Sequence, residues 1–397
     1  MTKNIKKDIC NYIDSIAETL LDVSHYIHAN PELAFDEHKS STRICETLSS
    51  FNLPVQKNVY GLETAFESRL EGTQSSGSSL DLLAEYDALP GIGHACGHNL
   101  IATAALGASL ALAKYQSAYS GNVRLLGTPA EEKGGGKEVM ARNGAFKNSA
   151  AAMMIHPSGS NLTTMPCICV AEVEVTYHGR SSHASAMPHK GINALDGLLI
   201  AYQAISNLRQ HIKPTERIHG IITEGGLAPN IVPELAVGVF YVRARNEVEL
   251  AALKPRVQAC FEAGAVGSGS TVDVKWAGVD YLDLNTNWPL ADKFQHNAES
   301  LGREFYPLEK LPQGYAGSTD MGNVSYRVPS IHPMLACAPH DVVIHHPEFE
   351  KWAGSETGDA AALDGAKSLA MTAIDYLTSQ TLRDECRNAF DVSTGLQ

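Results

Sequence analysis

The chain has 397 residues, enough for two domains that each bury a core of their own. It carries 31 basic and 44 acidic residues, and this acidic balance argues against nucleic acid or an anionic membrane as a partner. The N-terminus shows no signal-peptide pattern, and no apolar stretch is long enough to span a bilayer. The eight cysteines are irregularly spaced and do not suggest a disulfide framework, so we expect a cytoplasmic protein.

The first part of the chain alternates helix and strand patterns. Apolar residues at helical spacing predict a helix over 8–27 and, more weakly, another over 38–50. The series then continues with strand 79–84, loop 85–98, helix 99–115, strand 122–127, loop 128–136, helix 137–144 and strand 151–155. Strand–loop–helix units in series predict a mostly parallel sheet covered by helices, with ligands at the C-terminal ends of the strands.

Residues 168–278 follow a different order. The patterns predict strand 168–178, helix 191–209, strands 217–223 and 235–245, helix 247–263 and strand 271–276. This is the split βαβ order of a ferredoxin-like domain. Helical and strand signals alternate again after residue 285, with a helix expected over 355–378. We therefore predict a catalytic domain made of 1–167 and 284–397, interrupted by an inserted domain over 168–283.

Two loops that follow predicted strands carry side chains suited to metal chemistry. In HACGH at 94–98, Cys96 and His98 flank Gly97, which lets the backbone bend closely. In TPAEE at 128–132, Glu131 and Glu132 point different ways, so one can bind metal while the other acts as a general base. Each signal is weak by itself, because a buried cysteine beside a surface histidine, or a solvated acidic loop, has the same local sequence.

Two further histidine motifs complete a candidate centre. His156 ends the apolar strand of MMIHP, where the strand would fix its direction. In IHHPEF, one of His345 and His346 is expected to face the site, and the spacing does not say which. Thiolate, imidazole and carboxylate from four distant places are what a two-metal hydrolytic centre needs.

Other residues suit a role in substrate binding. His183, just after the first strand of the inserted domain, could stabilise an oxyanion. Asn230 and Arg243 could bind a substrate carboxylate, and Arg245 is an equal candidate on spacing alone. Two rival hypotheses remain open. One is a cysteine amidase with Cys96 as nucleophile and a neighbouring histidine as base; the other is a non-catalytic protein that binds an amide ligand.

As a set, these motifs resemble the M20 metallopeptidase family. HACGH in place of the usual bridging-aspartate motif is similar to its amidohydrolase branch, and the likeness runs from about residue 10 to 380. ALPGIGHACGHN and GSTDMGNVS resemble the sub-branch that contains M20 domain-containing dipeptidases and p-aminobenzoyl-glutamate hydrolase. The resemblance implies a zinc-peptidase-like α/β catalytic domain with an inserted ferredoxin-like α+β domain that serves as lid and dimerisation module.

The resemblance also implies roles for individual residues. Metal ligands would be Cys96, His98, Glu132, His156 and His345. Glu131 falls on the general base, Asp87 on an aspartate behind the metal site, and Asn230 and Arg243 on substrate-binding positions. His183 falls on a histidine that reaches a partner subunit's site, which implies a homodimer.

This chain departs from the pattern at two positions. Asn99 stands where many relatives have aspartate, and Glu85 stands where the wider family has a histidine ligand. The second departure leaves the coordination at each metal open. The implied activity is a metal-dependent amidohydrolase or dipeptidase that cuts an amide bond beside a carboxylate-bearing residue; an N-acyl amino acid hydrolase is the alternative. Two divalent ions are expected, with zinc favoured through Cys96 and manganese as the alternative.

Overall fold

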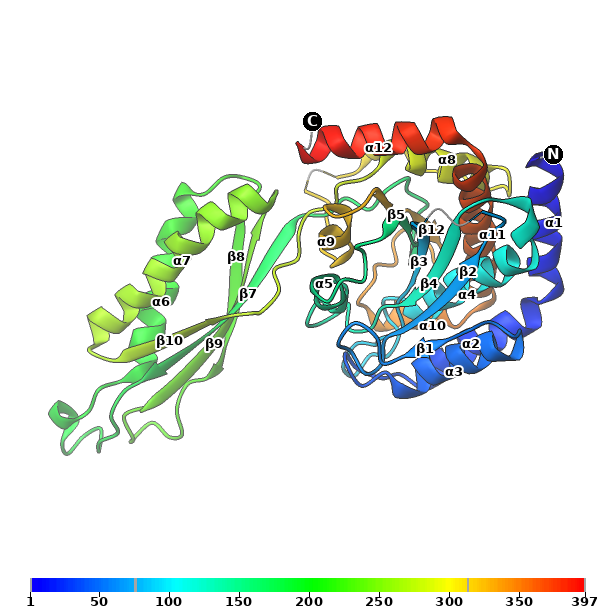
Figure 1. The fold of residues 1–397 in the computed structure, drawn as a ribbon. Coiled ribbons are helices and arrows are strands. Elements are labelled where there is room, and N and C mark those ends of the chain that lie inside the picture. The colour runs from blue at the N-terminus through cyan, green and yellow to red at the C-terminus, as the bar shows by residue number, and fades with distance from the viewer. Residues whose placement is uncertain (1, 75–76, 313, 396–397) are drawn as a thin grey trace. The chain divides into compact units, whose positions relative to one another are not determined.

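The computed structural model describes residues 2–74, 77–312 and 314–395. The chain forms two compact units (Figure 1). Unit 1 consists of Met1–Pro166, Leu284–Tyr315 and Thr319–Gln397, and unit 2 consists of Cys167–Asp283 and Ala316–Ser318. Among the described residues, no helix combines the length and apolar character needed to cross a membrane.

Unit 1 is built on a six-stranded sheet in the order β1-β2-β4-β3-β5-β11. The strands are β1 (Gln56–Lys57), β2 (Phe66–Glu71), β3 (Ser79–Ala84), β4 (Asn122–Gly127), β5 (Ser149–Met153) and β11 (Ser330–Ile331). The central pairs β4–β3, β3–β5 and β5–β11 are parallel, whereas β2 runs antiparallel to β4 and β1 antiparallel to β2. Short strands β6 (His156–Ser158) and β12 (Met334–Ala336) form a separate parallel pair. The carboxyl ends of β3, β4 and β5 therefore meet at one edge.

Helices cover this sheet (Figure 1). They are α1 (Thr2–Ser15), α2 (Ala17–Ala29), α3 (His38–Ser50), α4 (His98–Lys114), α5 (Gly136–Arg142), α8 (Trp288–Glu299), α9 (Met321–Ser325), α10 (Pro347–Ala353), α11 (Glu356–Thr378) and α12 (Gln380–Thr394). Helix α4 packs on β3 and β4, and α11 packs on α4. Small residues allow this close approach, because a Cβ on Gly107 would lie 2.9 Å from the Ala366 side chain. Strands β3 and β4 are buried along their whole length, as expected for strands covered on both faces.

The first predicted helix is divided in two. Instead of one helix over 8–27, α1 and α2 meet at Ile16, which leaves the helical conformation. The Ser15 hydroxyl donates a hydrogen bond to the Tyr12 carbonyl at 2.6 Å. A serine side chain that bonds a backbone carbonyl of the preceding turn competes with the helical ladder. The apolar spacing that predicted a continuous helix does not register this competition.

Unit 2 has its own sheet and its own core. Its elements are β7 (Cys169–His178), α6 (Ala194–Leu208), β8 (Arg217–Glu224), β9 (Leu235–Ala244), α7 (Glu247–Ser268) and β10 (Thr271–Trp276). The strands are antiparallel in the order β10-β7-β9-β8, and α6 and α7 pack on each other and on the sheet. Val173, Phe240 and Phe261 belong to the buried core between them. The predicted fold class, an α/β peptidase fold with an inserted ferredoxin-like domain, is confirmed.

Candidate functional site

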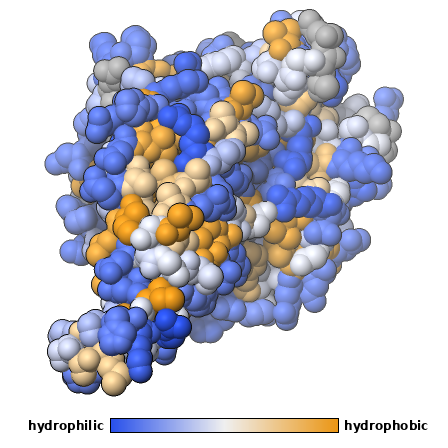
Figure 2. Space-filling model, turned by 90° about the vertical axis from the view of Figure 1, so that its left-hand side faces the viewer, coloured by the Kyte–Doolittle hydropathy of each residue, from blue (hydrophilic) through white to orange (hydrophobic). Residues whose placement is uncertain are grey.

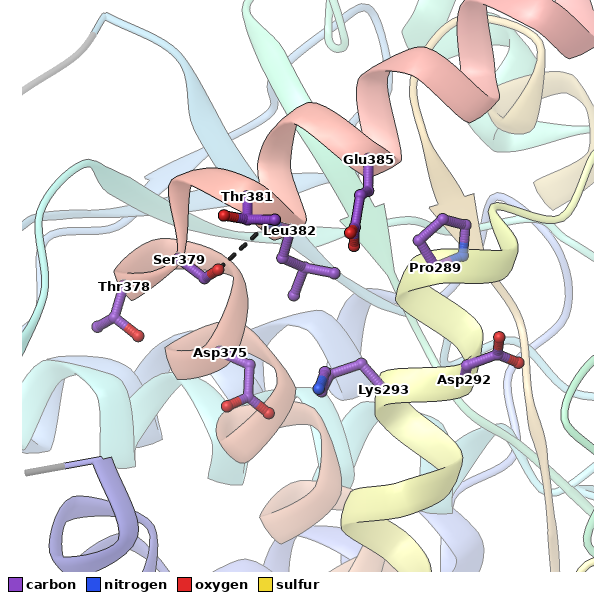
Figure 3. Close-up of a pocket in the computed structure, with 9 residues that line it drawn as sticks. All are labelled: Pro289, Asp292, Lys293, Asp375, Thr378, Ser379, Thr381, Leu382 and Glu385. Atoms are coloured by element: carbon purple, nitrogen blue, oxygen red, sulfur yellow. Dashed lines mark hydrogen bonds between the residues drawn. The ribbon is translucent and has the colours of Figure 1, made fainter.

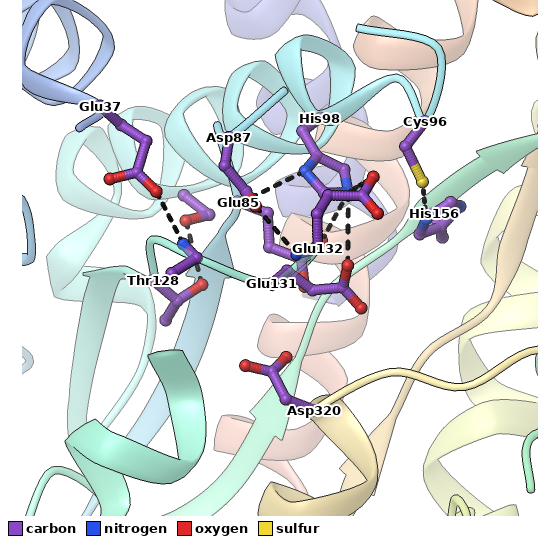
Figure 4. A network of polar contacts seen from close by, with 12 residues as sticks. Glu37, Glu85, Asp87, Cys96, His98, Thr128, Glu131, Glu132, His156 and Asp320 are labelled. Carbon is purple, nitrogen blue, oxygen red and sulfur yellow. Dashed lines mark hydrogen bonds and ion pairs between the residues drawn. The ribbon is translucent and has the colours of Figure 1, made fainter. Parts of the chain in front are cut away.

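The loops that leave three parallel strands of unit 1 carry the candidate ligands. Cys96 lies in the loop after β3, and His98 is the first residue of α4. Glu131 and Glu132 follow β4, and His156 begins β6 just after β5. These side chains converge at one edge of the sheet (Figure 4), which is where parallel α/β sheets place their ligands.

Gly97 allows Cys96 and His98 to face the same place. Its φ is +79°, and a Cβ at this position would lie 2.5 Å from Cγ of Pro157. Only glycine tolerates both the left-handed conformation and so close a neighbour. The bend then starts α4 at His98, so the imidazole is carried by a helix terminus and the thiol by the preceding turn.

Asp87 holds the His98 ring in place. Its Oδ1 lies 3.0 Å from His98 Nδ1, and its Oδ2 accepts the backbone N–H of Glu132 at 2.9 Å. The Nε2 atom of His98 then faces carboxylates, 3.8 Å from Glu132 Oε1 and 3.9 Å from Glu131 Oε2. Burial opposes the charge on Asp87, but His98 and the Glu132 N–H hold its pKa below the ordinary value. A carboxylate behind a histidine fixes its tautomer and leaves the other nitrogen free to act as a ligand.

His156 is fixed by a backbone carbonyl. Its Nδ1 donates to the carbonyl of Pro157 at 2.8 Å, so the lone pair is on Nε2, which lies 3.3 Å from Sγ of Cys96. Burial lowers the pKa of His156 well below the ordinary value, with His332 adding to the effect. A neutral imidazole facing a thiol is the arrangement that binds a soft divalent metal.

The structure separates the two histidines of IHHPEF. His345 Nε2 lies 3.4 Å from Glu132 Oε2, whereas His346 Nδ1 accepts the backbone N–H of Glu348 and caps α10. His345 has a φ of +64°, which is uncommon for a residue with a side chain, and its N–H donates to the Ala95 carbonyl at 2.9 Å. This strained conformation sends adjacent histidines in different directions, a choice that sequence spacing leaves undetermined.

The candidate ligand atoms form overlapping sets. Within each set, the ligand atoms lie within 4.8 Å of one another. The sets are Cys96–His98–His156, Cys96–Glu132–His345 and His98–Glu131–Glu132. Unit 1 thus brings together all five residues predicted as metal ligands and the predicted general base, and the Cys96 sulfur belongs to two of the sets.

Burial keeps the acidic members of this cluster from ionising freely. It raises the pKa of Cys96 and Glu131 well above their ordinary values and that of Glu132 to about 7, and neighbouring carboxylates add to each effect. Within the described part of the chain, the Nε2 of His98 and Oε1 of Glu132 are buried without a hydrogen-bond partner. A divalent cation would satisfy these atoms and favour the ionised ligands, so the donor set fits a metal centre.

A buried lysine next to this cluster was not predicted. Lys137 is fully buried, donates from Nζ to Asp320 Oδ1 at 2.6 Å, and pairs with Glu85. Burial opposes its charge, but Asp320 and Glu85 raise the pKa of Lys137 above the ordinary value. Glu85, Glu131 and Asp320 themselves form a buried acidic set. The motifs GGGK and GSTDMGNVS contain Lys137 and Asp320, but nothing in their local pattern says that the two meet.

Unit 2 brings two of the three predicted substrate-binding residues side by side. The N–H of Ala184, next to His183, donates to the Asn230 carbonyl at 3.0 Å. The ring Nδ1 of His183 accepts backbone N–H groups from Ser185 and Ala186, so its Nε2 carries the proton and is a donor. Arg243 lies on β9, where its guanidinium donates to Ser318 Oγ at 2.9 Å and stacks over Tyr241.

An open groove of about 640 Å³ lies elsewhere in unit 1, between α8, α11 and α12 (Figure 3). It is lined by Pro289, Asp292, Lys293, Asp375, Thr378, Ser379, Thr381, Leu382 and Glu385. These include none of the clustered candidate residues. We therefore assign the chemistry to the cluster at the strand ends, because, among the residues that the structure describes, no metal-ligand set includes a residue that lines the groove.

Comparison with known proteins identifies the family. The model of peptidase family M20/M25/M40 matches residues 82–373. A protein of Mus musculus called Xaa-Arg dipeptidase is 40% identical and covers 97% of this chain and 92% of its own length. One of the subunits of p-aminobenzoyl-glutamate hydrolase from Escherichia coli is 26% identical over 98% of this chain and 96% of its own. The chain therefore belongs to the M20/M25/M40 peptidase family, and the predicted class, a metal-dependent amidohydrolase or dipeptidase, is confirmed.

Solved structures support the same fold. A dinuclear metal binding peptidase of the M20 family from Bacillus subtilis superposes with a TM-score of 0.69 at 20% identity, covering 92% of this chain and 99% of that one. At this identity, the likeness shows the fold alone. The fold and the family thus agree, while the roles of individual residues remain predictions.

The Lys137 pair gives a prediction about stability. Replacing Lys137 with Met leaves Asp320 and Glu85 buried without their counter-charge, and we expect a loss of about 3–5 kcal/mol in the free energy of unfolding, measured by urea denaturation. Arg142→Met on the same helix is the control, because the Arg142 side chain is 55% exposed; it is expected to change stability by about 0.5 kcal/mol or less. Equal losses in the two variants would contradict this account of Lys137.

Proposed function

We propose that this chain is a dinuclear metallodipeptidase that hydrolyses the amide bond before a C-terminal basic residue. The observation that carries the proposal is the pair of ligand sets that share Cys96, one with His98 and His156 and the other with Glu132 and His345. The substrate class follows from the relative named Xaa-Arg dipeptidase, which is similar over nearly the whole chain. An N-acyl amino acid hydrolase is the alternative, because the same centre would cut either amide.

The donor atoms favour zinc. Thiolate and imidazole are preferred by zinc, while the carboxylate of Glu132 also suits manganese. Cys96, His98, Glu132, His156 and His345 would hold the two ions. When bound, divalent ions lower the pKa of a water to about 7 and polarise a carbonyl. The remaining steps fall to the protein's own side chains.

Glu131 is proposed as the general base. Its carboxylate lies beside the ligand sets without being needed to complete either set that contains Cys96. Burial, with Glu85, Glu132 and Asp320 nearby, raises the pKa of Glu131, and bound cations would favour the ionised form that accepts a proton. In this mechanism, Glu131 takes a proton from the attacking water and passes it to the leaving amine nitrogen, so the product amine leaves neutral.

Unit 2 is proposed to bind the substrate. His183 presents an Nε2–H donor that suits the developing oxyanion of the scissile carbonyl. Arg243 and Asn230 are proposed to bind the terminal carboxylate of the substrate, the guanidinium offering two parallel donors. The resemblance assigns His183 to the site of a second copy, which requires a dimer.

Edge strand β8 supports a homodimer. It is the last strand of the unit 2 sheet, and among the described residues no further strand pairs with its outer side. Ile221 is 65% exposed on β8, and Leu227 just beyond it is 89% exposed. Figure 2 shows apolar side chains gathered among hydrophilic ones on this unit. An exposed apolar edge strand invites pairing with another chain, and we propose that a second copy covers it.

The general base is tested by Glu131→Gln. We expect kcat for Ala-Arg hydrolysis to fall by about 10³-fold, because the amide cannot accept the water's proton. Bound metal, measured by elemental analysis, should stay at the wild-type level, since Glu131 is not a proposed ligand. The hydrolysis rates of the wild type on Ala-Leu and on N-acetylarginine are measured in the same assay. Wild-type activity in the variant would refute the base assignment, and a preference for N-acetylarginine would favour the alternative substrate class.

Metal removal separates the metalloenzyme from a cysteine amidase. Dialysis against a chelator is expected to abolish hydrolysis, and zinc or manganese added back should restore it, because water activation needs the cations. A cysteine amidase would keep its activity after chelation and lose it on thiol alkylation. If the metal-replete wild type hydrolysed no member of a broad dipeptide and N-acyl amino acid panel, a non-catalytic role would be favoured.

The dimer is tested at the edge of β8. Ile221→Lys places a charge on the exposed face of the strand and is expected to convert dimers to monomers in sedimentation velocity. Val392→Lys is the matched control, because Val392 is 63% exposed on α12 of unit 1. A wild-type monomer, or an Ile221→Lys variant that remains dimeric, would contradict the proposed interface.

A further inference from the structure

The turn that carries Glu131 has a strained backbone. Ala130, directly before it, has a φ of +61°, a left-handed conformation that residues with a side chain seldom adopt. The turn is also tight, because a Cβ on Gly136 would lie 1.8 Å from the Pro129 carbonyl oxygen. A strained conformation persists only when surrounding contacts determine it. The direction of the Glu131 carboxylate therefore depends on what holds Ala130.

Glu37 provides this contact from a distant part of the chain. Its Oε1 accepts the N–H of Ala130 at 2.8 Å and that of Phe35 at 2.9 Å. Its Oε2 accepts the Thr64 hydroxyl at 2.8 Å, and the side chain is fully buried. Figure 4 shows Glu37 beside the start of this turn. A carboxylate with three donors and no exposure is held rigidly, so it can in turn hold the backbone.

We propose that Glu37 is a positioning residue for the proposed general base: its hydrogen bond to the Ala130 N–H sets the direction of the Glu131 carboxylate. The inference rests on the proposed function, in which Glu131 moves the proton. Glu37 acts through the backbone and touches no reacting atom.

Two other buried carboxylates also accept N–H groups of this segment, Asp87 from Glu132 and Asp320 from Lys137. Both have further partners in the site, because Asp87 contacts His98 and Asp320 pairs with the Lys137 ammonium. Their replacement would disturb ligands and charges together. Glu37 instead bonds two backbone N–H groups and a threonine hydroxyl, none of which belongs to a proposed metal ligand, so its effect on the turn can be measured separately.

Hydrogen-bond geometry, not charge, is the active feature of Glu37. Burial and the nearby Asp87 carboxylate raise the pKa of Glu37 to about 7, while its hydrogen-bond donors oppose the shift. In the protonated form Oε2 can donate to the Thr64 hydroxyl while Oε1 still accepts from Ala130. A glutamine can make the same three contacts, with its oxygen toward the backbone and its NH₂ toward Thr64. An aspartate is one methylene shorter and cannot span both partners.

The experiment compares Glu37→Gln, Glu37→Asp and Glu37→Ala in the metal-loaded protein. We expect Glu37→Gln to keep kcat within about 3-fold of wild type, and the other two to lose about 100-fold in kcat with KM changed less than about 3-fold. Thr64→Val is the control for a merely structural role, because it removes a Glu37 partner but leaves the Ala130 bond. It should lower the melting temperature while kcat stays within about 3-fold.

Hydrogen exchange tests the contact between Glu37 and the Ala130 N–H without measuring enzyme activity. The peptide over 128–136 should exchange faster in Glu37→Ala than in wild type, while β9 of unit 2 is unchanged. Unaltered exchange there, or wild-type kcat in Glu37→Ala and Glu37→Asp, overturns the proposal, as does a Glu37→Gln variant as impaired as Glu37→Ala. If Glu37→Ala does not fold, Glu37→Asp supplies both readouts. If the wild type hydrolyses no dipeptide, the proposed function fails, and the exchange result alone decides whether Glu37 holds the turn.

Discussion

Buried negative charge is the constraint on which unit 1 depends. The carboxylates of Glu85, Asp87, Glu131 and Asp320 are all buried, and the Glu132 side chain is only 8% exposed beside them. Neighbouring carboxylates repel one another strongly where water is excluded, so each carboxylate needs a partner of opposite charge or a hydrogen-bond donor. On one side of the cluster, Lys137 pairs with Glu85 and Asp320. On the other side, the carboxylates belong to ligand sets that suit cations.

Glu85 has a partner on the lysine side of this cluster. The resemblance places a histidine ligand of the wider family at this position, whereas the structure pairs Glu85 with the Lys137 ammonium. Its other oxygen lies 3.4 Å from Nε2 of His98. A carboxylate committed to a buried lysine is a poor metal ligand, and Cys96 supplies a donor to two ligand sets nearby.

The buried carboxylates also hold the turn after β4, which carries Glu131 and Glu132. The proposed general base, Glu131, is adjacent to the proposed metal ligand Glu132, so its carboxylate must point in one direction only, and small displacements at such positions cost activity. The turn achieves this with a strained Ala130 and with backbone N–H groups bound to buried carboxylates. Unit 2 differs, because it has a separate core and places His183 and Asn230 in exposed loops, which is compatible with the substrate-binding roles proposed for them.

Much of the fold and the identity of the clustered residues could be read from the sequence. Periodicity placed β3, β4, α4 and the whole order of unit 2, because side-chain spacing follows the local geometry of strands and helices. Periodicity did not predict strand β2, because antiparallel pairing with β4 leaves no periodic signal. It also did not predict the division between α1 and α2, because a hydrogen bond from a serine to a backbone carbonyl leaves none either.

Residue type alone pointed to Cys96, His98, His156 and the pair Glu131 and Glu132, because few side chains bind metals and these follow predicted strands; the family resemblance then chose Glu132 as the ligand. Residue spacing left His345 and His346 equal, and the resemblance favoured His345; the tertiary structure alone showed that His345 faces Glu132, that Lys137 neutralises Asp320, and that Glu37 reaches Ala130. Those outcomes depend on one backbone dihedral angle and on contacts between segments up to 213 residues apart, the separation of Glu132 and His345. The local sequence determines neither that dihedral angle nor those long-range contacts.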